Sequence, residues 1–250
     1  MGEFTGKVVV VTGGSKGIGG AAVKRFCEEG AHCIIVSRNG QEGKAYAETL
    51  RQIGLSADAM AADVGKVSDI KQMAQDLVGR YGKIDVLVNC AGVNVRKPAL
   101  EYNEEDWDYI MDINLKGSYF CSVEIGRHMV ARGTGAIVNL ASLQAHVVLP
   151  ERTIYAASKG GVAQFTKGLA NEWAQKGVRV NSISPAFIGT PMVAKVMDDP
   201  AWVQLIQSRT PMGRVGTPEE VADLIVFLAS SRAGYITGTD VAIDGGWTAS

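Results

Sequence analysis

A tyrosine and a lysine stand four positions apart in the segment TIYAASKGG, at Tyr155 and Lys159. In a helix this spacing places both side chains on one face, about one turn apart. A phenol with an ordinary pKa of about 10 is a weak base at neutral pH, but a nearby ammonium group favours the phenolate and lowers that pKa. The pair can therefore act as a general acid in reduction and a general base in oxidation. The alternative is a pair on a solvated helix.

Two further polar residues follow apolar, strand-like segments. Ser142 comes after GAIVNLA, and Asn89 begins the small-residue turn NCAG, which ends at Gly92. In a doubly wound sheet the carboxyl ends of the strands face the ligand crevice. Asn114 lies inside a helical pattern, where asparagine is unfavourable and tends to bond the backbone or water. Its local sequence is equally consistent with a helix kink and with a functional role.

Between residues 8 and 20 the chain passes from four successive valines to a cluster of glycines, VVVVTGGSKGIGG. The valine run favours a strand covered on both faces. The glycines follow G-x-x-x-G-x-G, at Gly13, Gly17 and Gly19, which differs from the commoner G-x-G-x-x-G spacing. The free N–H groups at the start of the following helix suit a phosphate. We therefore expect a phosphate-binding loop, the alternative being a glycine turn without a ligand.

Strand-like runs and helical patterns alternate along the whole chain. The runs lie at 7–12, 32–37, 56–62, 85–90, 135–141, 178–184 and 240–243, and the helical patterns at 17–29, 41–53, 66–80, 104–131, 152–176 and 217–229. This alternation predicts a single α/β domain over 1–250, with a doubly wound (Rossmann-type) parallel sheet of about seven strands and helices on both faces. The long irregular segment at about 185–216 is predicted to be a substrate lid, the alternative being a surface excursion with short helices.

The composition excludes several classes of function. The 250 residues are 46% hydrophobic and carry a formal net charge of −1 without long runs of one sign, so neither nucleic acid nor a membrane surface is an expected partner. Cys27, Cys33, Cys90 and Cys121 form no C-x-x-C pair, so we expect reduced thiols rather than disulfides or a metal site. Because no apolar stretch is long enough to span a bilayer, a cytoplasmic protein is expected.

Together, these motifs resemble those of the classical short-chain dehydrogenases/reductases over essentially the whole chain. TGGSKGIG is similar to the cofactor loop of that family, NCAG to its N-N-A-G turn, SPAFIGT to its P-G-x-x-x-T segment and DGGW to its C-terminal strand end. Asn114, Ser142, Tyr155 and Lys159 fall in order on its catalytic tetrad. The resemblance implies an oxidoreductase that interconverts a secondary alcohol and a ketone by hydride transfer with a nicotinamide cofactor.

The resemblance also implies a role for each member of the tetrad. Tyr155 would exchange the proton with the substrate oxygen, and Lys159 would lower the pKa of Tyr155 and hold the nicotinamide ribose. Ser142 would donate a hydrogen bond to the substrate carbonyl. Asn114 would position a water that links Lys159 to solvent.

The cofactor contacts expected from the resemblance include Asp63 at the adenine, and Ile188 and Thr190 at the carboxamide and phosphates. Two residues depart from the family pattern: Cys90 replaces the second asparagine of the turn, and Ala186 replaces the glycine that follows Pro185. The full expected set is Gly13, Ser15, Lys16, Gly17, Ile18, Gly19, Ser37, Arg38, Asp63, Val64, Asn89, Ala91, Gly92, Tyr155, Lys159, Ile188 and Thr190.

The end of the second strand-like run predicts NADP(H) rather than NAD(H). NAD-specific folds usually place an acid there to accept from the ribose 2′-hydroxyl. This chain has the uncharged Ser37, followed by Arg38, whose guanidinium matches a phosphate. Lys16 in the glycine loop adds a second positive charge. The alternative is that both cations are ordinary surface residues and either cofactor serves.

The second half of the chain is most similar to the gluconate and sugar-alcohol members of the family, so a small polar substrate such as a sugar acid or polyol is expected. The residues expected to line its pocket are Ser142, Gln144, Arg152, Tyr155, Phe187, Met192 and Trp202. One alternative is a 3-oxoacyl-(carrier protein) reductase that docks its acidic carrier on a patch of Arg127, Arg132 and Arg152. Another is a catalytically silent cofactor-binding sensor, against which the intact tetrad argues.

The resemblance further implies a homotetramer. The helical patterns at 104–131 and 152–176 are expected to carry an outer apolar face with Phe120, Phe165 and Trp173. A monomer would leave such a face exposed to water, which is uncommon. The residues alone indicate only that the protein is not a monomer, and symmetry favours a closed assembly.

Overall fold

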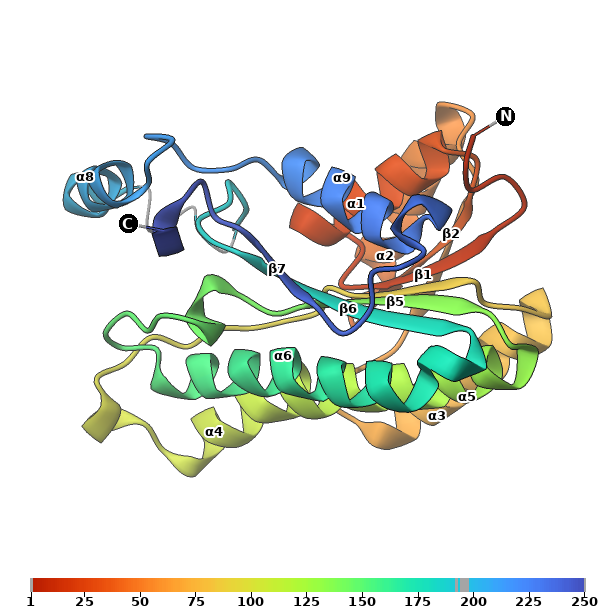
Figure 1. Ribbon diagram of the computed structural model, residues 1–250, viewed down its shortest axis with the longest axis horizontal. Helices are drawn as coiled ribbons and strands as arrows, with labels where there is room; N and C mark the ends of the chain where they lie inside the picture. Colours follow the sequence, from red (N-terminus) through yellow and green to blue (C-terminus); the bar gives the residue numbers. More distant parts are fainter. Residues whose placement is uncertain (1, 192, 194–197, 250) are drawn as a thin grey trace.

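The molecule is built around a sheet of seven parallel strands (Figure 1). The computed structural model describes residues 2–191, 193 and 198–249. The spatial order of the strands is β3-β2-β1-β4-β5-β6-β7. Their bounds are β1 (Val8–Thr12), β2 (His32–Ser37), β3 (Ala57–Ala61), β4 (Val86–Asn89), β5 (Gly135–Leu140), β6 (Val178–Pro185) and β7 (Asp240–Ile243). The expected fold class, a doubly wound parallel α/β sheet, is confirmed.

Helices cover both faces of this sheet (Figure 1). One face carries α1 (Gly17–Glu28), α2 (Gly40–Gln52) and α9 (Pro218–Ala229). The other carries α3 (Val67–Tyr81), α5 (Ser118–Arg132) and α6 (Thr153–Trp173), and α4 (Glu104–Met111) packs beside α6. The short helix α8 (Pro200–Arg209) lies apart from the sheet at one end of the molecule (Figure 1). Among these described helices, none has the length and apolar character needed to cross a bilayer.

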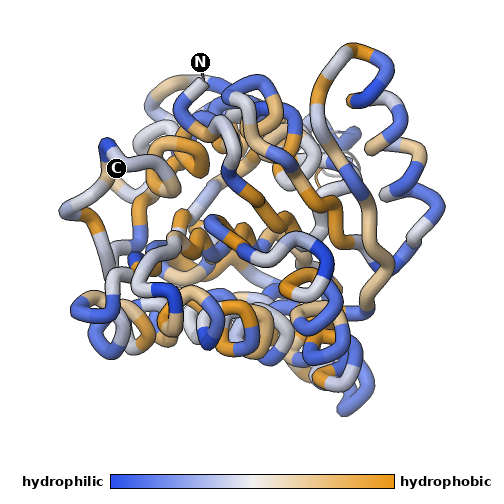
Figure 2. The backbone as a smooth tube through the Cα atoms, turned by 90° about the vertical axis from the view of Figure 1, so that its right-hand side faces the viewer, coloured by the Kyte–Doolittle hydropathy of each residue, from blue (hydrophilic) through white to orange (hydrophobic). Residues whose placement is uncertain are grey.

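The valines of β1 explain why that strand lacks polar alternation. Successive side chains of a strand point to opposite faces of the sheet. Val9 and Val11 accordingly pack in the core under α1 and α9, while Val8 and Val10 pack in the core under α3 and α5. Figure 2 shows the same arrangement, with hydrophobic strand segments between two helical layers whose outer turns are hydrophilic. Both faces of the strand are buried, so both need apolar side chains.

The strand order reverses beside β1. The chain runs outward from β1 through β2 to β3, then returns to pair β4 with the other side of β1. Thr12 is aligned with Val36 of β2 and Asn89 of β4, so the carboxyl ends of the three strands lie side by side. Ligands of such sheets bind in the crevice at this reversal. The glycine loop and the NCAG turn both begin there.

The helix expected at 104–131 is divided into three parts. The α-helix α4 passes into a π-helical turn at Asp112–Gly117, and α5 continues from Ser118. Asn114 lies in that turn, where it bonds outside its own helix. Single π turns of this kind are frequent at functional sites. The segment expected as a lid, 185–216, contains α8, and its closure stays a prediction.

The expected outer apolar face is partly wrong. Trp173 is buried within this chain, because α5 carries Gly126 opposite it: a Cβ at Gly126 would lie 2.6 Å from the indole ring. Phe120 and Phe165 are half-buried, and the exposed Tyr119 meets both edge to face, at 5.4 and 5.6 Å between ring centroids. Of the aromatic side chains in these two helical patterns, the exposed ones are Trp107, Tyr109 and Tyr119.

The arginine docking patch of the alternative hypothesis is wrong. Arg132 donates to the carbonyl of Ile84 at 3.0 Å and pairs with Asp85 at 3.2 Å, which ties the end of α5 to the sheet. Arg152 is 5% exposed, so it belongs to the interior. Of the three arginines only Arg127 stands out into solvent, beside Glu124. These cations therefore form no shared surface.

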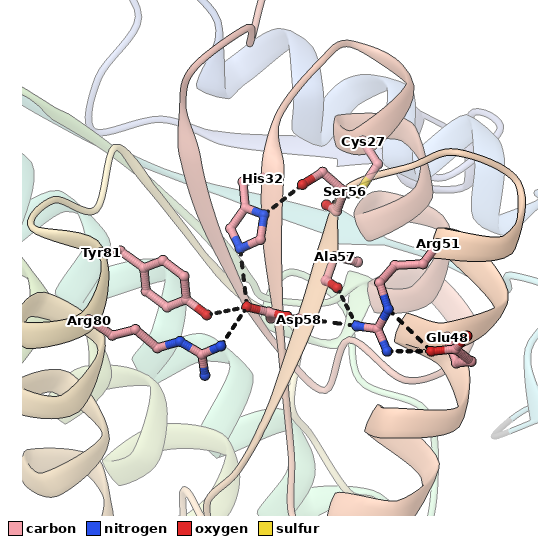
Figure 3. Close-up of polar contacts among 9 residues, drawn as sticks. All are labelled: Cys27, His32, Glu48, Arg51, Ser56, Ala57, Asp58, Arg80 and Tyr81. Atoms are coloured by element: carbon pink, nitrogen blue, oxygen red, sulfur yellow. Dashed lines mark hydrogen bonds and ion pairs between the residues drawn. The ribbon is translucent and has the colours of Figure 1, made fainter.

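The edge of the sheet is closed by a polar cluster around Asp58 on β3 (Figure 3). Tyr81 donates to this carboxylate at 2.7 Å and Arg80 at 3.0 Å, both from α3. Arg51 of α2 reaches it at 3.7 Å, and His32 of β2 at 3.5 Å. One carboxylate thus joins two strands and two helices at the edge where the sheet has no further neighbour.

Candidate active site

A pocket of about 620 Å³ opens at the carboxyl ends of the strands. It gathers most of the residues that the sequence singles out. Those that line it are Gly13, Ser15, Lys16, Gly17, Ile18, Gly19, Ser37, Arg38, Asp63, Val64, Ala91, Gly92, Ser142, Gln144, Arg152, Tyr155, Lys159, Phe187, Ile188 and Thr190. Asn89, Asn114 and Trp202 stand outside this lining, and Met192 lies outside the described residues.

The side chain of Asn89 lies behind the pocket, although a cofactor contact is expected for it. Its amide donates to Asn139 of β5 at 2.8 Å and to Ser122 of α5 at 3.0 Å. At 1% exposure the side chain ties three elements together beneath the site. The structure therefore gives this side chain a scaffolding role.

The glycine loop packs directly on the NCAG turn. Gly13 has a φ of 66°, and a Cβ there would lie 2.9 Å from the Cα of Ala91. A Cβ at Gly19 would lie 2.3 Å from the carbonyl oxygen of Gly13. The helix α1 that follows has no side-chain cap and no acidic residue in its first turn. Its amide groups are thus available to an anion, as a dinucleotide pyrophosphate requires.

Tyr155 and Ser142 both line the other end of the pocket. Tyr155 lies in the first turn of α6, and Ser142 comes two residues after the end of β5. The backbone N–H of Gln144 donates to Ser142 Oγ at 3.2 Å, which orients the hydroxyl. Burial raises the pKa of Tyr155, while the hydrogen bond with Ser142 and the positive charge of Arg152 oppose that rise. The opposing cation is thus Arg152, although the Y-x-x-x-K spacing indicates Lys159 for that effect.

Lys159 is buried one turn farther along α6. Its Nζ donates to the carbonyl of Leu140 at 2.7 Å and lies 5.8 Å from the centroid of the Tyr155 ring. Burial lowers the pKa of Lys159 to about 8. A Cβ at Gly92 would lie 3.6 Å from this Nζ and 3.4 Å from Asn114 Oδ1. The lysine and the asparagine therefore border the same glycine.

Asn114 uses both ends of its amide. Its Oδ1 accepts from the backbone N–H of Val93 at 2.8 Å, and its Nδ2 donates to the carbonyl of Val93 at 2.9 Å and to Ser158 Oγ at 3.1 Å. The side chain thereby joins the loop after β4 to α6. These contacts lie where the helix departs from α-helical geometry. A water relay through this residue stays a prediction.

The ribose end of the pocket contains one residue that the sequence did not single out. Glu42 lies in the first turn of α2, lines the pocket, and pairs with Lys16 at 3.4 Å. Ser37 donates to the carbonyl of Asn39 at 2.8 Å, and Asn39 caps α2. Arg38 lines the pocket beside them. The acid at the start of a helical pattern was visible in the sequence, but only the folded loop places it beside Lys16.

The substrate end combines apolar and basic side chains. Phe187 lines the pocket and packs on Trp247, with 5.2 Å between ring centroids. Gln144 Oε1 accepts from the backbone N–H of Leu149 at 3.1 Å, which holds the loop after β5. Arg96 also lines the pocket and was missed, since nothing in the sequence distinguishes it from a loop cation. Trp202 of α8 stacks on it from outside the lining.

Known proteins are similar to this chain over nearly its whole length. A family model described as Enoyl-(Acyl carrier protein) reductase matches residues 13–248. The D-threitol dehydrogenase of Mycolicibacterium smegmatis is 40% identical over 246 residues, which cover 98% of this chain and 94% of that protein. The 3-oxoacyl-[acyl-carrier-protein] reductase FabG of Chlamydia pneumoniae is 38% identical over 247 residues, with 98% of both proteins covered.

A solved structure similar to this one is the gluconate 5-dehydrogenase from Burkholderia cenocepacia, in complex with NADP and tartrate. It superposes with a TM-score of 0.96 at 33% sequence identity, and the match covers 99% of this chain and 97% of the other. The similarity therefore extends over the sheet, both helical layers and the pocket.

Proposed function

As a member of the short-chain dehydrogenase/reductase family, this chain is an oxidoreductase of alcohols and ketones, and we propose that it uses NADP(H) on a small polar substrate such as a sugar acid or a polyol. The observation that carries the proposal is that Ser142, Tyr155 and the buried Lys159 lie together at the end of a pocket that begins at a glycine loop. The intact set also argues against a silent cofactor sensor.

The pocket fits a dinucleotide in three respects. The glycine loop leaves no room for side chains at Gly13 and Gly19, the first amides of α1 lack a cap, and the turn at Gly92 brings the backbone close to Lys159. The glycine loop and Tyr155 line the same pocket, so one ligand can contact both. When bound, the nicotinamide supplies or accepts the hydride.

The chain's own residues handle the proton. In reduction, the hydroxyl of Tyr155 donates its proton to the substrate oxygen, while the hydroxyl of Ser142 donates a hydrogen bond to the same oxygen. In oxidation the phenolate of Tyr155 accepts that proton. Lys159 would hydrogen-bond the nicotinamide ribose, and Asn114 would position a water that links Lys159 to solvent as a proton relay.

The ribose end of the pocket supports NADP(H). Ser37 leaves the end of β2 without an acid, and Arg38 and Lys16 supply two cations that match a 2′-phosphate. The related gluconate 5-dehydrogenase was solved with NADP. A 2′-phosphate would compete with Glu42 for Lys16, so this pair at 3.4 Å opens when NADP(H) binds.

We also propose a substrate lid and an oligomer. The segment 185–216 closes over the substrate as a lid, carrying Trp202 on α8. The protein forms a homotetramer in the cytoplasm, through a cluster on α5 and α6 made of the exposed Tyr119 and the half-buried Phe120 and Phe165. Light scattering that reports a single chain at micromolar concentration would contradict the tetramer.

A second candidate is a 3-oxoacyl-(carrier protein) reductase, which the 38% identity to FabG of Chlamydia pneumoniae favours. A panel of polyols, aldonates, β-keto esters and carrier-bound 3-oxoacyl substrates, each with both cofactors, separates the two. The proposal expects higher kcat/KM for the small polar substrates. Higher kcat/KM for the carrier-bound ones would establish the second candidate.

Tyr155→Phe tests the acid–base assignment within the same panel. The variant keeps the ring, which packs, and loses only the hydroxyl, which moves the proton. We expect kcat to fall by about 100-fold or more, with the Kd for NADPH nearly unchanged in a fluorescence titration. A variant that retains more than about a tenth of the wild-type kcat would exclude Tyr155 as the acid–base group.

A further inference from the structure

Arg152 is a buried guanidinium group at the substrate end of the pocket. It is 5% exposed, it lines the pocket, and it donates to the carbonyl of Pro150 at 3.0 Å. Within the described part of the chain, no carboxylate lies within ion-pair distance of it. A guanidinium has five N–H donors, so most of them face the pocket without an acceptor. A buried charge is stable only when it is paired, which makes this position suited to an anionic ligand.

The backbone before Arg152 is strained. Glu151 has a φ of 63°, and among the described residues it is the only one other than glycine in that region. Its carbonyl accepts from the backbone N–H of Lys97 at 3.3 Å and from Tyr102 Oη at 3.0 Å. Such strain persists where surrounding contacts enforce it, and it concentrates at ligand clamps. The loop after β4 thereby fixes the conformation from which Arg152 enters the pocket.

A second guanidinium stands beside the first. Arg96 and Arg152 lie 4.9 and 5.0 Å, measured from Cζ, from the centroid of the same Trp202 ring. Arg96 also lines the pocket, and its positive charge helps burial to lower the pKa of Arg152. The two positive charges over the Trp202 ring repel each other. An anionic ligand between them would relieve that repulsion.

The charge of this group indicates the charge of the ligand. Arg96 pairs with Glu151 at 3.6 Å, so Arg96, Glu151 and Arg152 together carry one net positive charge. A carboxylate is a monoanion whose two oxygens match the planar fork of a guanidinium. A phosphate monoester dianion would leave this group with an excess of negative charge.

We propose that Arg152, assisted by Arg96 and covered by Trp202, binds a carboxylate of the substrate, so that the enzyme acts on hydroxy or keto acids in preference to neutral polyols. This inference rests on the proposed function, since it names the substrate class of the same site. Arg152 lies three residues before Tyr155. A carboxylate bound to Arg152 would therefore lie close to the reacting carbon of the substrate, whose oxygen contacts the Tyr155 hydroxyl. A neutral polyol leaves the buried guanidinium unpaired, and a site built for a polar partner discriminates strongly against a ligand that lacks it.

The test compares substrates that differ only in the carboxylate. The pairs are 3-oxobutanoate with its methyl ester in reduction, and an aldonate with the alditol of the same length and configuration in oxidation. We expect wild-type kcat/KM to favour the acid by about 10- to 100-fold, and Arg152→Gln to bring the acid-to-neutral ratio close to one. Arg96→Gln is expected to lower the ratio by a smaller factor, since Arg96 is already paired.

The matched control is Arg127→Gln, which removes an exposed arginine whose partner is Glu124 of the same helix. Its acid-to-neutral ratio is expected to equal that of the wild type. A wild-type ratio at or below one would overturn the proposal, as would an unchanged ratio in a folded Arg152→Gln. If Arg152→Gln does not fold, the test rests on Arg96→Gln, since Arg96 is partly exposed. An unchanged acid-to-neutral ratio in Arg96→Gln would then count against carboxylate binding by these two arginines.

A binding measurement separates this inference from the proposed function. If neither member of a substrate pair is turned over with either cofactor, the proposed function fails. Calorimetry on the protein still tests whether Arg152 binds a carboxylate. Gluconate and tartrate are expected to bind the wild type at least about 10-fold tighter than Arg152→Gln, and glucitol is expected to show no difference. Inorganic phosphate that binds as tightly as gluconate would overturn the assignment to a carboxylate.

Discussion

Arg152 lies three residues before Tyr155, and its positive charge opposes the rise that burial produces in the pKa of Tyr155. The same guanidinium faces the pocket without a carboxylate partner among the described residues. One side chain therefore connects the choice of substrate with the acidity of the proton donor. When a substrate carboxylate pairs with Arg152, part of that positive charge is neutralised, and the phenol becomes a weaker acid.

Replacing Arg152 is expected to move the pH dependence of catalysis. Alcohol oxidation needs the phenolate of Tyr155, so its rate rises as the pH increases through the pKa of that group. Arg152→Gln removes a cation that favours the phenolate, so the pKa rises further and the ascending limb moves to higher pH. Profiles of kcat with a neutral alcohol, which does not depend on carboxylate binding, measure this shift. A limb that moves to lower pH, or coincides with that of Arg127→Gln, would contradict the interaction.

Lys159→Met is expected to stabilise the protein while it abolishes turnover. Burial lowers the pKa of Lys159 from 10.5 to about 8, so at neutral pH the folded chain holds a buried charge that the unfolded chain exposes to water. Methionine removes this charge, at the loss of one hydrogen bond to Leu140. The melting temperature at pH 7 should therefore rise, by about 2–4 °C for each kcal/mol gained.

The stability difference between Lys159→Met and the wild type should depend on pH. Between pH 8 and 10.5 the unfolded chain keeps a proton on Lys159 that the folded chain has lost, so the wild-type free energy of unfolding gains with pH from this group. The advantage of Lys159→Met should thus shrink as the pH rises through that window. A Tm difference that is negative at neutral pH, or grows with pH, would contradict the account.

The sequence predicted the layout well where chemistry and periodicity coincide. The valines at 8–11 indicated a strand buried on both faces, and Tyr155 with Lys159 indicated one helix face in a pocket. It did not reveal that Trp173 is buried, because that depends on Gly126 of another helix. Arg96 was missed for a similar reason, since only the fold brings its loop to Trp202. The sequence therefore did not predict features that depend on contact between two elements far apart in the chain.

Asp58→Asn is expected to destabilise the edge of the sheet. Burial would raise the pKa of Asp58, but the hydrogen bond from Tyr81 and the charges of Arg80, His32 and Arg51 outweigh it and lower the pKa. Asparagine removes the charge that these donors share, which should cost about 1.5–3 kcal/mol in the free energy of unfolding. Chemical denaturation at neutral pH measures the loss.

The carboxylate at Asp58 stabilises the fold only while it is ionised. Because its folded pKa lies below the ordinary value, its contribution is present at neutral pH and disappears as the pH falls through the folded pKa. The difference between wild type and Asp58→Asn should vanish in acid. Asp76→Asn on α3, where Gln72 is the hydrogen-bond partner, is the control and should change stability little. Equal losses in both variants would show that the cluster adds nothing specific.

The cofactor preference is expected to depend on four residues at the ribose end. Wild-type kcat/KM should be higher with NADP(H), because Arg38 and Lys16 pair with the 2′-phosphate and Ser37 carries no opposing charge. Ser37→Asp combined with Arg38→Ala should move the preference toward NAD(H) by about 10- to 100-fold, the range of a charge-assisted phosphate contact. Glu42→Gln should move it the other way, because it releases Lys16 and removes an acid from the pocket.

The matched control for Glu42→Gln is Glu48→Gln, about 1.7 turns farther along α2, where the carboxylate pairs with Arg51 outside the pocket. Both variants remove one negative charge from the same helix, so a general electrostatic effect would change the KM for NADP(H) equally in both. The expected result is a lower KM for NADP(H) in Glu42→Gln alone, with the KM for NAD(H) unchanged in both. Since NAD(H) lacks the 2′-phosphate, it has nothing to gain from a released Lys16. A wild-type enzyme with higher kcat/KM for NAD(H) would refute the roles given to Ser37, Arg38 and Lys16.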